Sequence, residues 1–393
     1  MNTYEYPKSR ELFERACKVI PAGIYGHLGP SEGCFTPIEA YPFYGKKAEG
    51  AYIWDVDGNR FIDYMCAYGP IVLGYRHPEV EAAAKAQMDL ADCAVLPSER
   101  MVELAELLTS TIKSADWAFF AKNGGDVTNL AMVAARAHTG RKKIVKFAGG
   151  YHGVAQWMKA LGYAGIIEED VSSIITIPWG DPEAFREIVK KNPDQIAGLI
   201  STPYHHPAMT DNEVPPEGFW QEMRKICTDN GIVLIIDDVR AGFRLDIAGS
   251  DHYYGFEADL ICYCKALANG YNISALCGKR ALKESVSSVF YTGSYWLSSV
   301  PMAAAIKTIE LLKDMDGPAL MLKMGRKLTD GLAAGAAEYG FNLKISGEPS
   351  MWYMRLTDDD SGILHQEWVG ECVKRGVFFT NHHNLFMNTA VTD

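Results

Sequence analysis

The 393-residue sequence lacks features that mark whole classes of protein. It has no lysine/arginine-rich run, and its formal net charge of −11 argues against nucleic acid or an anionic membrane as a partner. No apolar run approaches the ~20 residues of a membrane-spanning helix. No basic flank followed by an apolar stretch opens the chain, so we expect no secretory signal. These absences predict a cytoplasmic protein.

Paired cysteine motifs are absent as well. The nine cysteines form no CxxC pair, and several lie inside apolar, strand-like runs. Scattered cysteines of odd number are typical of a reducing compartment, where thiols act as small buried hydrophobes. We therefore expect neither a disulfide framework nor a metal site. The pairs His205–His206 and His382–His383 are weak metal candidates, because adjacent histidines lack the spacing of a shared ligand face.

Short apolar segments alternate with amphipathic helical patterns through the middle of the chain. Such alternation indicates a mainly parallel sheet covered on both faces. We predict an α/β fold, with a large domain that has a mainly parallel seven-stranded sheet between helices, and a smaller α+β domain. The expected strands are residues 117–122, 143–149, 172–179, 196–202, 232–237, 259–265 and 273–279.

The length predicts two domains, since single cores stop growing near ~250–300 residues. Residues 1–60 are expected to form an N-terminal segment of the small domain, with a hairpin around the turn pair Asp57-Gly58. Residues 61–305 would form the large domain and 306–393 the C-terminal small domain. The last residues, NLFMNTAVTD, include no closing helix, so this domain could be truncated.

The expected strands 232–237 and 259–265 deliver charged residues to the edge where open α/β sheets bind ligands. The stretch LIIDDVRAGFR (234–244) runs from apolar residues into Asp237 and Asp238. Neighbouring strand residues point to opposite sides, so one acid should face the site while the other is held elsewhere. In DLICYCK (259–265), Lys265 ends a buried strand, where a lysine is costly unless it is neutral, paired or covalently used.

Two further strand ends carry glycine-rich sequences. In residues 119–140 a turn follows the strand, and a helix is expected to begin near Asp126. The N–H groups of a helix N-terminus suit a phosphate. FAGGYHGVAQW (147–157) places Tyr151 and His152 between glycines after another strand. Each of these features alone also fits an ordinary structural role.

Together the four strand ends fit one ligand, pyridoxal 5′-phosphate (PLP). This cofactor needs an amine for a Schiff base, an acid for its pyridine nitrogen, donors for its phosphate and an aromatic surface under its ring. The candidates are Lys265, Asp237, the turn at Gly124 and Gly125, and Tyr151, in that order.

The chain resembles the class III PLP-dependent aminotransferases of fold type I, and among them the glutamate-1-semialdehyde 2,1-aminomutase branch. The resemblance runs almost end to end. It is carried by AEGAYIWDVDGNRFIDYMCAYGPIVLGYRHPEV (48–80), TGRKKIVKFAGGYHG (139–153) and IIDDVRAGFR. It implies that the large domain, 61–305, binds PLP and that two chains form a homodimer with shared active sites.

The resemblance also implies roles for matching positions. Lys265 would form the Schiff base and move protons, Asp237 would pair with the pyridine nitrogen, and Val239 would pack opposite Tyr151. Ser294 falls where the family usually has a threonine that reaches the neighbouring subunit's phosphate. The expected catalytic residues are Lys265, Asp237 and Tyr151, and the expected cofactor-binding residues are Asn123, Gly124, Gly125, Tyr151, His152, Asp237, Val239, Arg240, Lys265 and Ser294.

Departures from that branch argue against the aminomutase reaction. No arginine stands near Gly29, where the aminomutase binds the substrate carboxylate, and its gating loop is replaced by VAQWMKALGYAGIIEEDVSS (154–173). Arg240 could replace the clamp or hold O3′ of the cofactor, and Arg355 is a weaker candidate that a surface salt bridge also explains. The candidate substrate residues are Tyr25, His27, Tyr68, Asp238, Arg240 and Trp296, with simple packing as the alternative for the aromatic ones.

We therefore predict an aminotransferase that moves an amino group between an amino acid or amine and a keto acid or aldehyde. An aminomutase of the glutamate-1-semialdehyde type, or an amino-acid racemase or epimerase, shares the same motifs and stays an alternative. A non-catalytic PLP-binding protein is less favoured, because it would not need both Lys265 and Asp237. The expected partners are a small-molecule amino donor and a carbonyl acceptor.

Overall fold

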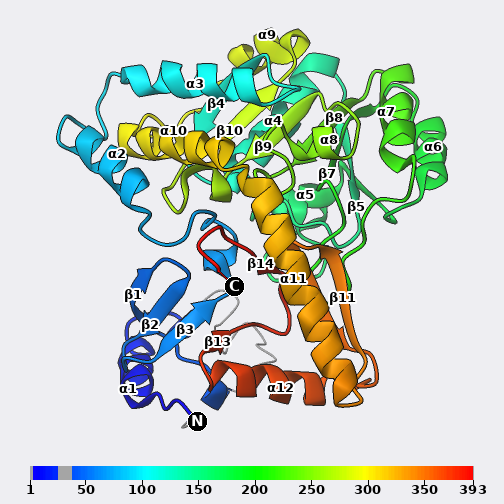
Figure 1. Cartoon of the computed structure of the whole chain (residues 1–393). Helices are drawn as coiled ribbons and strands as arrows, with labels where there is room; N and C mark the ends of the chain where they lie inside the picture. The colour runs from blue at the N-terminus through cyan, green and yellow to red at the C-terminus, as the bar shows by residue number, and fades with distance from the viewer. Residues whose placement is uncertain (1–2, 25–37, 393) are drawn as a thin grey trace. The chain divides into compact units, whose positions relative to one another are not determined.

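The computed structural model describes residues 3–24 and 38–392 (Figure 1). The chain divides into two compact units, which are described separately. The larger unit lies within residues 78–207 and 213–320, and the smaller within 1–77, 208–212 and 321–393. These units change at 77/78 and 320/321, whereas the domain boundaries expected at 60/61 and 305/306 stay a prediction.

The larger unit is built on a seven-stranded sheet of order β4-β10-β9-β8-β7-β5-β6. The strands β9, β8, β7, β5 and β6 pair in parallel, and β10 is antiparallel to both of its neighbours. Every residue of β7 and β8 is buried, as expected for central parallel strands. The predicted sheet is confirmed. Its strands are β4 (Trp117–Ala121), β5 (Lys143–Phe147), β6 (Ile174–Ile177), β7 (Ile196–Ser201), β8 (Val233–Asp237), β9 (Leu260–Tyr263) and β10 (Ser274–Gly278).

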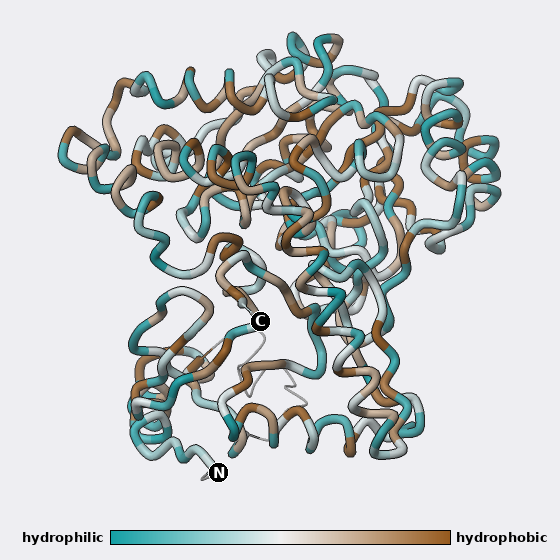
Figure 2. Tube along the Cα trace, viewed as in Figure 1, coloured by the Kyte–Doolittle hydropathy of each residue, from teal (hydrophilic) through white to brown (hydrophobic). Residues whose placement is uncertain are grey.

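Several helices of the larger unit bury an apolar face. Helix α4 (Gly124–Thr139) turns Val127, Leu130 and Ala134 into the core, next to strand residues such as Leu276 and Cys262. Burying a side chain such as Leu130 stabilises the fold by about 1.5–3 kcal/mol. Figure 2 shows brown and teal residues mixed along α6 (Pro182–Lys191) and α7 (Phe219–Asp229), which fits their one-sided burial.

The remaining elements of this unit are α2 (Pro78–Met88), α3 (Glu99–Thr111), η4 (Gln156–Met158), α5 (Glu168–Val171), α6 (Pro182–Lys191), α7 (Phe219–Asp229), α8 (Ser250–Tyr253), η5 (Lys265–Ala268), η6 (Arg280–Leu282), α9 (Lys283–Ser288) and α10 (Ser299–Asp314). Helix α11 (Gly317–Glu338) begins in this unit and continues in the smaller one. No helix formed by the described residues is long and apolar enough to span a bilayer.

The smaller unit contains two small sheets, β1-β2-β3-β13 and β11-β12-β14. The predicted hairpin is present, because β2 and β3 pair antiparallel around a turn with Gly58 at φ 96°. The carboxylate of Asp57 in this turn accepts the backbone N–H groups of Lys8 (2.8 Å) and Ser9 (3.0 Å), at the start of α1. The elements are α1 (Pro7–Ala16), η2 (Ile38–Ala40), β1 (Gly45–Glu49), β2 (Tyr52–Asp55), β3 (Arg60–Asp63), η3 (Cys66–Tyr68), β11 (Leu343–Glu348), β12 (Met351–Leu356), α12 (Ile363–Val373), β13 (Val377–Phe378) and β14 (Leu385–Phe386).

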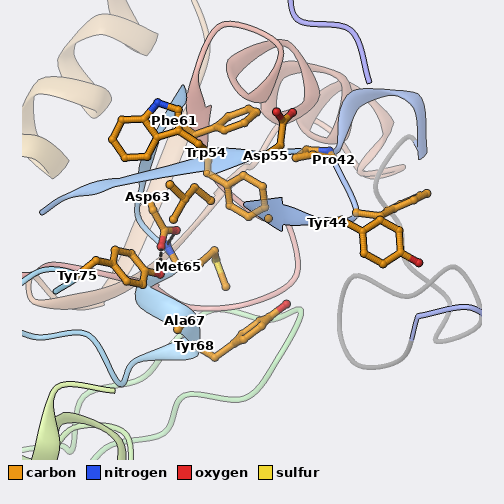
Figure 3. Close-up of a pocket in the computed structure, with 14 residues that line it drawn as sticks. Pro42, Tyr44, Trp54, Asp55, Phe61, Asp63, Met65, Ala67, Tyr68 and Tyr75 are labelled. Atoms are coloured by element: carbon orange, nitrogen blue, oxygen red, sulfur yellow. Dashed lines mark hydrogen bonds between the residues drawn. The ribbon is translucent and has the colours of Figure 1, made fainter. Parts of the chain in front are cut away.

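A left-handed turn in the smaller unit carries Tyr68. Cys66, Ala67 and Tyr68 have φ angles of 46°, 53° and 64°, which cost about 1–2 kcal/mol per residue in an L-amino acid. The buried carboxylate of Asp63 holds this turn by accepting the N–H of Met65 at 2.8 Å and the hydroxyl of Tyr75 at 2.6 Å (Figure 3). The Tyr68 ring lies beside the His383 ring at 5.2 Å and lines a pocket of this unit.

Candidate active site

Neighbouring strands bring Asp237 and Lys265 into one region of the larger unit. Asp237 ends β8 opposite Cys262 of β9, and Lys265 opens η5 two residues beyond the end of β9. The φ angle of Lys265 is 40°, a left-handed conformation that L-residues rarely adopt and that is often found at functional sites. The negative charge of Asp237 acts on the Lys265 amine and opposes the lowering of its pKa. The structure thus places these two predicted residues together.

The environment of Lys265 favours a neutral amine. The side chain is half-buried, and this burial lowers its pKa from 10.5 to about 7. The charges of Arg240 and Arg244 lower the pKa further, whereas Cys264 and Asp237 oppose them. A neutral amine is the nucleophilic form, so near pH 7 a large share of Lys265 can attack a carbonyl.

Asp237 is held by a histidine. Its Oδ2 lies 2.7 Å from Nδ1 of His152, and its Oδ1 accepts the N–H of Val239 at 3.1 Å. Both partners of the first contact are buried, with side-chain exposures of 1% for His152 and 5% for Asp237. An ionised carboxylate only accepts, so Nδ1 of His152 carries the hydrogen. The pair fixes the direction in which the acid presents its charge.

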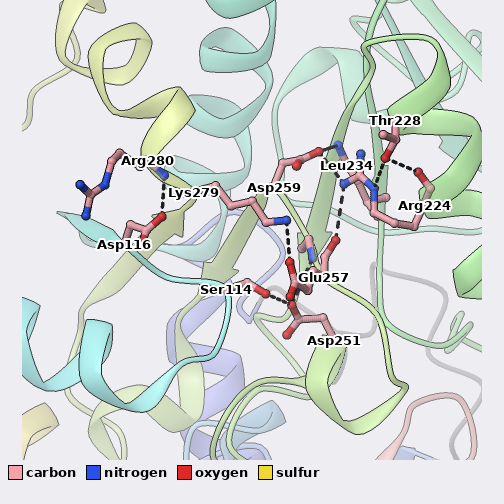
Figure 4. A network of polar contacts seen from close by, with 11 residues as sticks. Ser114, Asp116, Arg224, Thr228, Leu234, Asp251, Glu257, Asp259, Lys279 and Arg280 are labelled. Carbon is pink, nitrogen blue, oxygen red and sulfur yellow. Dashed lines mark hydrogen bonds and ion pairs between the residues drawn. The ribbon is translucent and has the colours of Figure 1, made fainter.

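Asp238 is used differently from its neighbour. Its carboxylate accepts the N–H of Ser250 at 3.1 Å and the hydroxyl of Ser250 at 2.5 Å. Burial raises the pKa of Asp238 to about 7, although the bonds from Ser250 oppose this rise. Another acid, Asp251 of α8, accepts the hydroxyl of Ser114 in the same way (Figure 4). Adjacent acids therefore do point to different partners, and Asp238 is tied to α8.

The turn before α4 closely approaches Val239. The helix begins at Gly124, two residues before the expected start, and Asp126 Oδ2 accepts the N–H of Asn123 at 2.7 Å. A Cβ atom on Gly124 would lie 2.8 Å from Cγ1 of Val239, so only glycine permits this approach. The first turn of α4, where backbone N–H groups lack partners within the helix, thus lies against the segment that follows Asp237.

The loop with Tyr151 and His152 also lies against α4. The hydroxyl of Thr128 donates to the His152 carbonyl at 2.6 Å. A Cβ atom on Gly153, whose φ is 115°, would lie 2.8 Å from Cα of Gly125. Tyr151 itself is 56% exposed, although His152 beside it is buried. An aromatic ring is thus open to a ligand next to the buried Asp237.

These observations fit PLP. A buried, histidine-held acid suits the pyridine nitrogen, and an amine with a lowered pKa suits the carbonyl. The close glycine approaches leave backbone N–H groups of α4 able to meet a phosphate. The residues that the structure brings together here are Asn123, Gly124, Gly125, Tyr151, His152, Asp237, Val239, Arg240 and Lys265.

The sequence did not single out His206 as a partner of Arg240. Nη1 of Arg240 lies 3.1 Å from Nδ1 of His206 and donates to the His206 carbonyl at 3.0 Å. His205 instead stacks on Trp179, with ring centroids 5.3 Å apart. The two adjacent histidines therefore face different neighbours. Only the position of His206 just after β7, at the carboxyl edge of the sheet, could have drawn attention to it.

Other predicted residues lie outside this cluster of contacts. Trp296 packs against Phe119 and Tyr291, with ring centroids 6.3 Å and 5.3 Å apart, as its packing alternative expects. Ser294 is exposed, and its carbonyl accepts the Cys93 thiol at 3.5 Å. Tyr68 belongs to the smaller unit, and Tyr25 and His27 lie outside the described residues.

Arg355 forms a salt bridge, which was the alternative to its role as a substrate clamp. Its Nε and Nη2 donate to Asp211 at 2.8 and 2.9 Å, and Lys344 pairs with the same carboxylate at 2.7 Å. The three residues all lie in the smaller unit. The Arg355 guanidinium therefore already has an anionic partner, the Asp211 carboxylate, which it shares with Lys344.

Comparisons with known proteins agree with this geometry. The sequence model of the class-III aminotransferase family matches residues 38–392. An aminopentol aminotransferase from Sphingopyxis macrogoltabida is 40% identical over 98% of this chain and 90% of its own. A glutamate-1-semialdehyde 2,1-aminomutase from Hyperthermus butylicus is 33% identical over 87% of this chain and 82% of its own.

A solved structure is similar over nearly the whole chain. The FumI protein of Sphingopyxis sp. MTA144, in its PLP internal aldimine form, superposes with a TM-score of 0.93 at 40% identity, covering 98% of this chain and 92% of that one. The fold and site define a PLP-dependent enzyme of fold type I. The chain belongs to the class-III aminotransferase family. The predicted family, fold, cofactor and enzyme class are confirmed.

Proposed function

We propose that this PLP-dependent aminotransferase uses Lys265 to attach its cofactor and Asp237 to hold the cofactor's pyridine nitrogen. The observation that carries this assignment is the pairing of β8 with β9, which sets the two residues at adjacent strand ends. His152 orients Asp237, Tyr151 and Val239 would contact the two faces of the ring, and Gly124 and Gly125 would meet the phosphate.

The residues would divide the chemistry as follows. When bound, the cofactor supplies an electron-withdrawing ring that makes the C–H bond beside the substrate nitrogen acidic. Asp237, held by His152, keeps a negative charge at the ring nitrogen, which a buried cation requires as a partner. Nζ of Lys265, a large share of which is neutral near pH 7, would take the proton from the substrate carbon. The half-buried position of Lys265 limits competition from water for that proton.

The proposed amino donor is a primary amine whose amino-bearing carbon carries no carboxylate. Two features support this class. Arg355, a candidate carboxylate clamp, is already paired with Asp211. The relative at 40% identity is named for an aminopentol, an amine and not an acid. The proposed acceptor is a keto acid or aldehyde.

A donor panel tests this proposal. The purified protein with PLP is offered amino alcohols, alkylamines and α-amino acids, each with an ¹⁵N-labelled amino group, and a keto-acid acceptor. We expect transfer of the label from an amino alcohol or alkylamine to the acceptor, with an aldehyde or ketone as the other product. Reaction with α-amino acids alone would contradict the donor class. Label retained in one molecule without an acceptor would instead indicate an aminomutase.

We further propose a homodimer, with Ser294 at the contact between two copies. Exposed apolar side chains surround Ser294 and the segment 88–102, among them Val95 at 95% and Phe290 at 93% exposure. The two segments are joined, since the Cys93 thiol bonds the Ser294 carbonyl and Ser299 N–H bonds the Asp92 carbonyl at 3.2 Å. An apolar surface of this kind marks an interaction site.

Light scattering tests the dimer. We expect twice the chain mass for the native protein and a shift to single chains when Val95→Asp and Leu96→Asp are combined. Val19→Asp, at a position that is 81% exposed in the smaller unit, is the matched control and should keep the native mass. A native protein with the mass of one chain would contradict the proposal.

A further inference from the structure

Hydrogen bonds to neighbouring residues hold the segment after β7, which carries His206. The hydroxyl of Thr202 donates to the Tyr204 carbonyl at 2.8 Å, and Nε1 of Trp220 donates to the Pro203 carbonyl at 2.8 Å. On the other side, His205 exchanges both backbone hydrogen bonds with Glu213, at 2.9 and 2.8 Å. The position of His206 is therefore set by its neighbours before any ligand is present.

His206 offers Arg240 two acceptors and no charge. Nη1 of Arg240 contacts both the ring nitrogen Nδ1 and the carbonyl oxygen of His206. A guanidinium only donates, so Nδ1 accepts and the ring hydrogen sits on Nε2. Burial, followed by the charge of Arg240, lowers the pKa of His206 well below its usual range. The imidazole thus stays neutral and fixes the guanidinium without cancelling its charge.

The held guanidinium lies within electrostatic reach of the site. The charge of Arg240 adds to burial in lowering the pKa of Lys265, and the charge of Asp237 opposes the lowering of the Arg240 pKa that burial causes. Burial raises the pKa of the Tyr151 hydroxyl, while the charge of Arg240 lowers this pKa and that of Asp237 raises it. The other charged or titratable groups that act on Lys265 are Cys264, Asp237 and Arg244. A small movement of Arg240 would change its effect on the lysine.

We propose that His206 is a positioning residue, whose Nδ1 and carbonyl oxygen hold Arg240 as a fixed positive charge beside Lys265. The proposal rests on the proposed function in taking Lys265 as the lysine that carries the cofactor. It predicts that the charge acts on the nitrogen of Lys265 in the loaded enzyme. A positive charge nearby disfavours a protonated nitrogen, so loosening Arg240 should make that nitrogen easier to protonate.

The test is a pH titration of the visible absorption band of the full-length, PLP-loaded protein. Arg240→Met sets the scale, and we expect it to raise the apparent pKa of the band by about one unit. His206→Leu removes the ring acceptor but leaves the carbonyl, so we expect a smaller rise of about 0.5 unit. His206→Asn, whose side-chain oxygen can replace Nδ1, should titrate as the native protein does. Should the leucine variant fail to fold, His206→Ser is too short to reach Nη1 and replaces it.

The adjacent histidine supplies the matched control. His205→Asn changes a residue that stacks on Trp179 and does not bond Arg240 through its ring, so its titration should be native. An upward shift for His206→Leu that His206→Asn abolishes supports the proposal. A native titration of His206→Leu beside a shifted Arg240→Met overturns it, as does an equal shift in the His205 control.

Failure of the proposed function gives a different result. Borohydride reduction of the same samples fixes the cofactor to the lysine that carries it. If the native protein carries the cofactor on another lysine, the role of Lys265 is wrong. If Lys265 carries the cofactor, the titrations of the His206 variants then decide the positioning role alone.

Discussion

The two ends of strands β8 and β9 handle charge in opposite ways. At their amino ends, Asp259 Oδ2 accepts the N–H of Leu234 at 2.8 Å and pairs with Nη1 of Arg224 at 2.7 Å (Figure 4). Lys279 and Glu257 form a second pair nearby at 2.9 Å. Asp259 and Glu257 thus each meet a cation. These contacts connect the amino ends of the strands, and they occupy the charged groups that form them.

At the carboxyl ends, two charged groups contact imidazole rings. His152 holds Asp237, and His206 holds Arg240. A histidine can fix a charged group by hydrogen bonding without cancelling its charge. The comparison shows that ion pairs connect groups at one end of these strands, whereas at the other end histidines contact the charged groups Asp237 and Arg240.

The largest effect that tests this contrast is expected from Asp237→Asn. The amide keeps the size of the side chain and can still contact His152, but it brings no negative charge to the ring nitrogen. We expect turnover to fall by about 100-fold or more, the scale for losing one pre-organised electrostatic group. Steady-state kinetics with a reactive donor measure this, and thermal melting checks the fold. Turnover within a factor of about two of native would break the contrast between the two ends.

A smaller, pH-dependent effect is expected from Asp238→Asn. Burial raises the folded-state pKa of Asp238 to about 7, above its ordinary value of 3.8. Ionisation therefore destabilises the folded state, and the stability that the protonated acid provides is lost as the pH rises from about 4 through about 7. Urea unfolding should show that the native protein loses stability relative to the Asn variant across this window. A difference independent of pH would contradict the assignment.

The smallest effect is expected at the opposite end of the strands, from Arg224→Gln. The ion pair with Asp259 is partly exposed, so its loss should cost at most about 1 kcal/mol of unfolding free energy. Turnover should stay native, because this ion pair lies at the opposite end of the strands from the proposed site. A large loss of turnover with an unchanged melting temperature would show that the two ends do not differ as described.

Much of the fold could be predicted from the sequence because its strands are nearly continuous apolar runs. The seven strands have local signals of this kind, and the hairpin is marked by its turn pair Asp57-Gly58. The starts of elements were less predictable, since α4 begins at Gly124 and not near Asp126. A capping carboxylate at Asp126 gives no clear sign of whether it opens the helix or lies in its first turn.

Site residues could be predicted only where burying a charged side chain is energetically costly. A lysine and an acid at the ends of buried strands need a partner, so Lys265 and Asp237 could be singled out. His206 could not, because its role depends on a contact with Arg240, 34 positions further along the chain. Trp296 shows the opposite case, since nothing in the sequence separates a packed aromatic ring from one that contacts a substrate.

The most direct measurement is to locate the cofactor's attachment point. The protein is loaded with PLP, reduced with borohydride, digested and mapped by mass spectrometry, beside a Lys265→Ala variant treated identically. The label is expected on the peptide with Lys265 in the native protein and on no peptide of the variant. A label on a different lysine, or an equal label in the variant, would contradict the assignment of the active site.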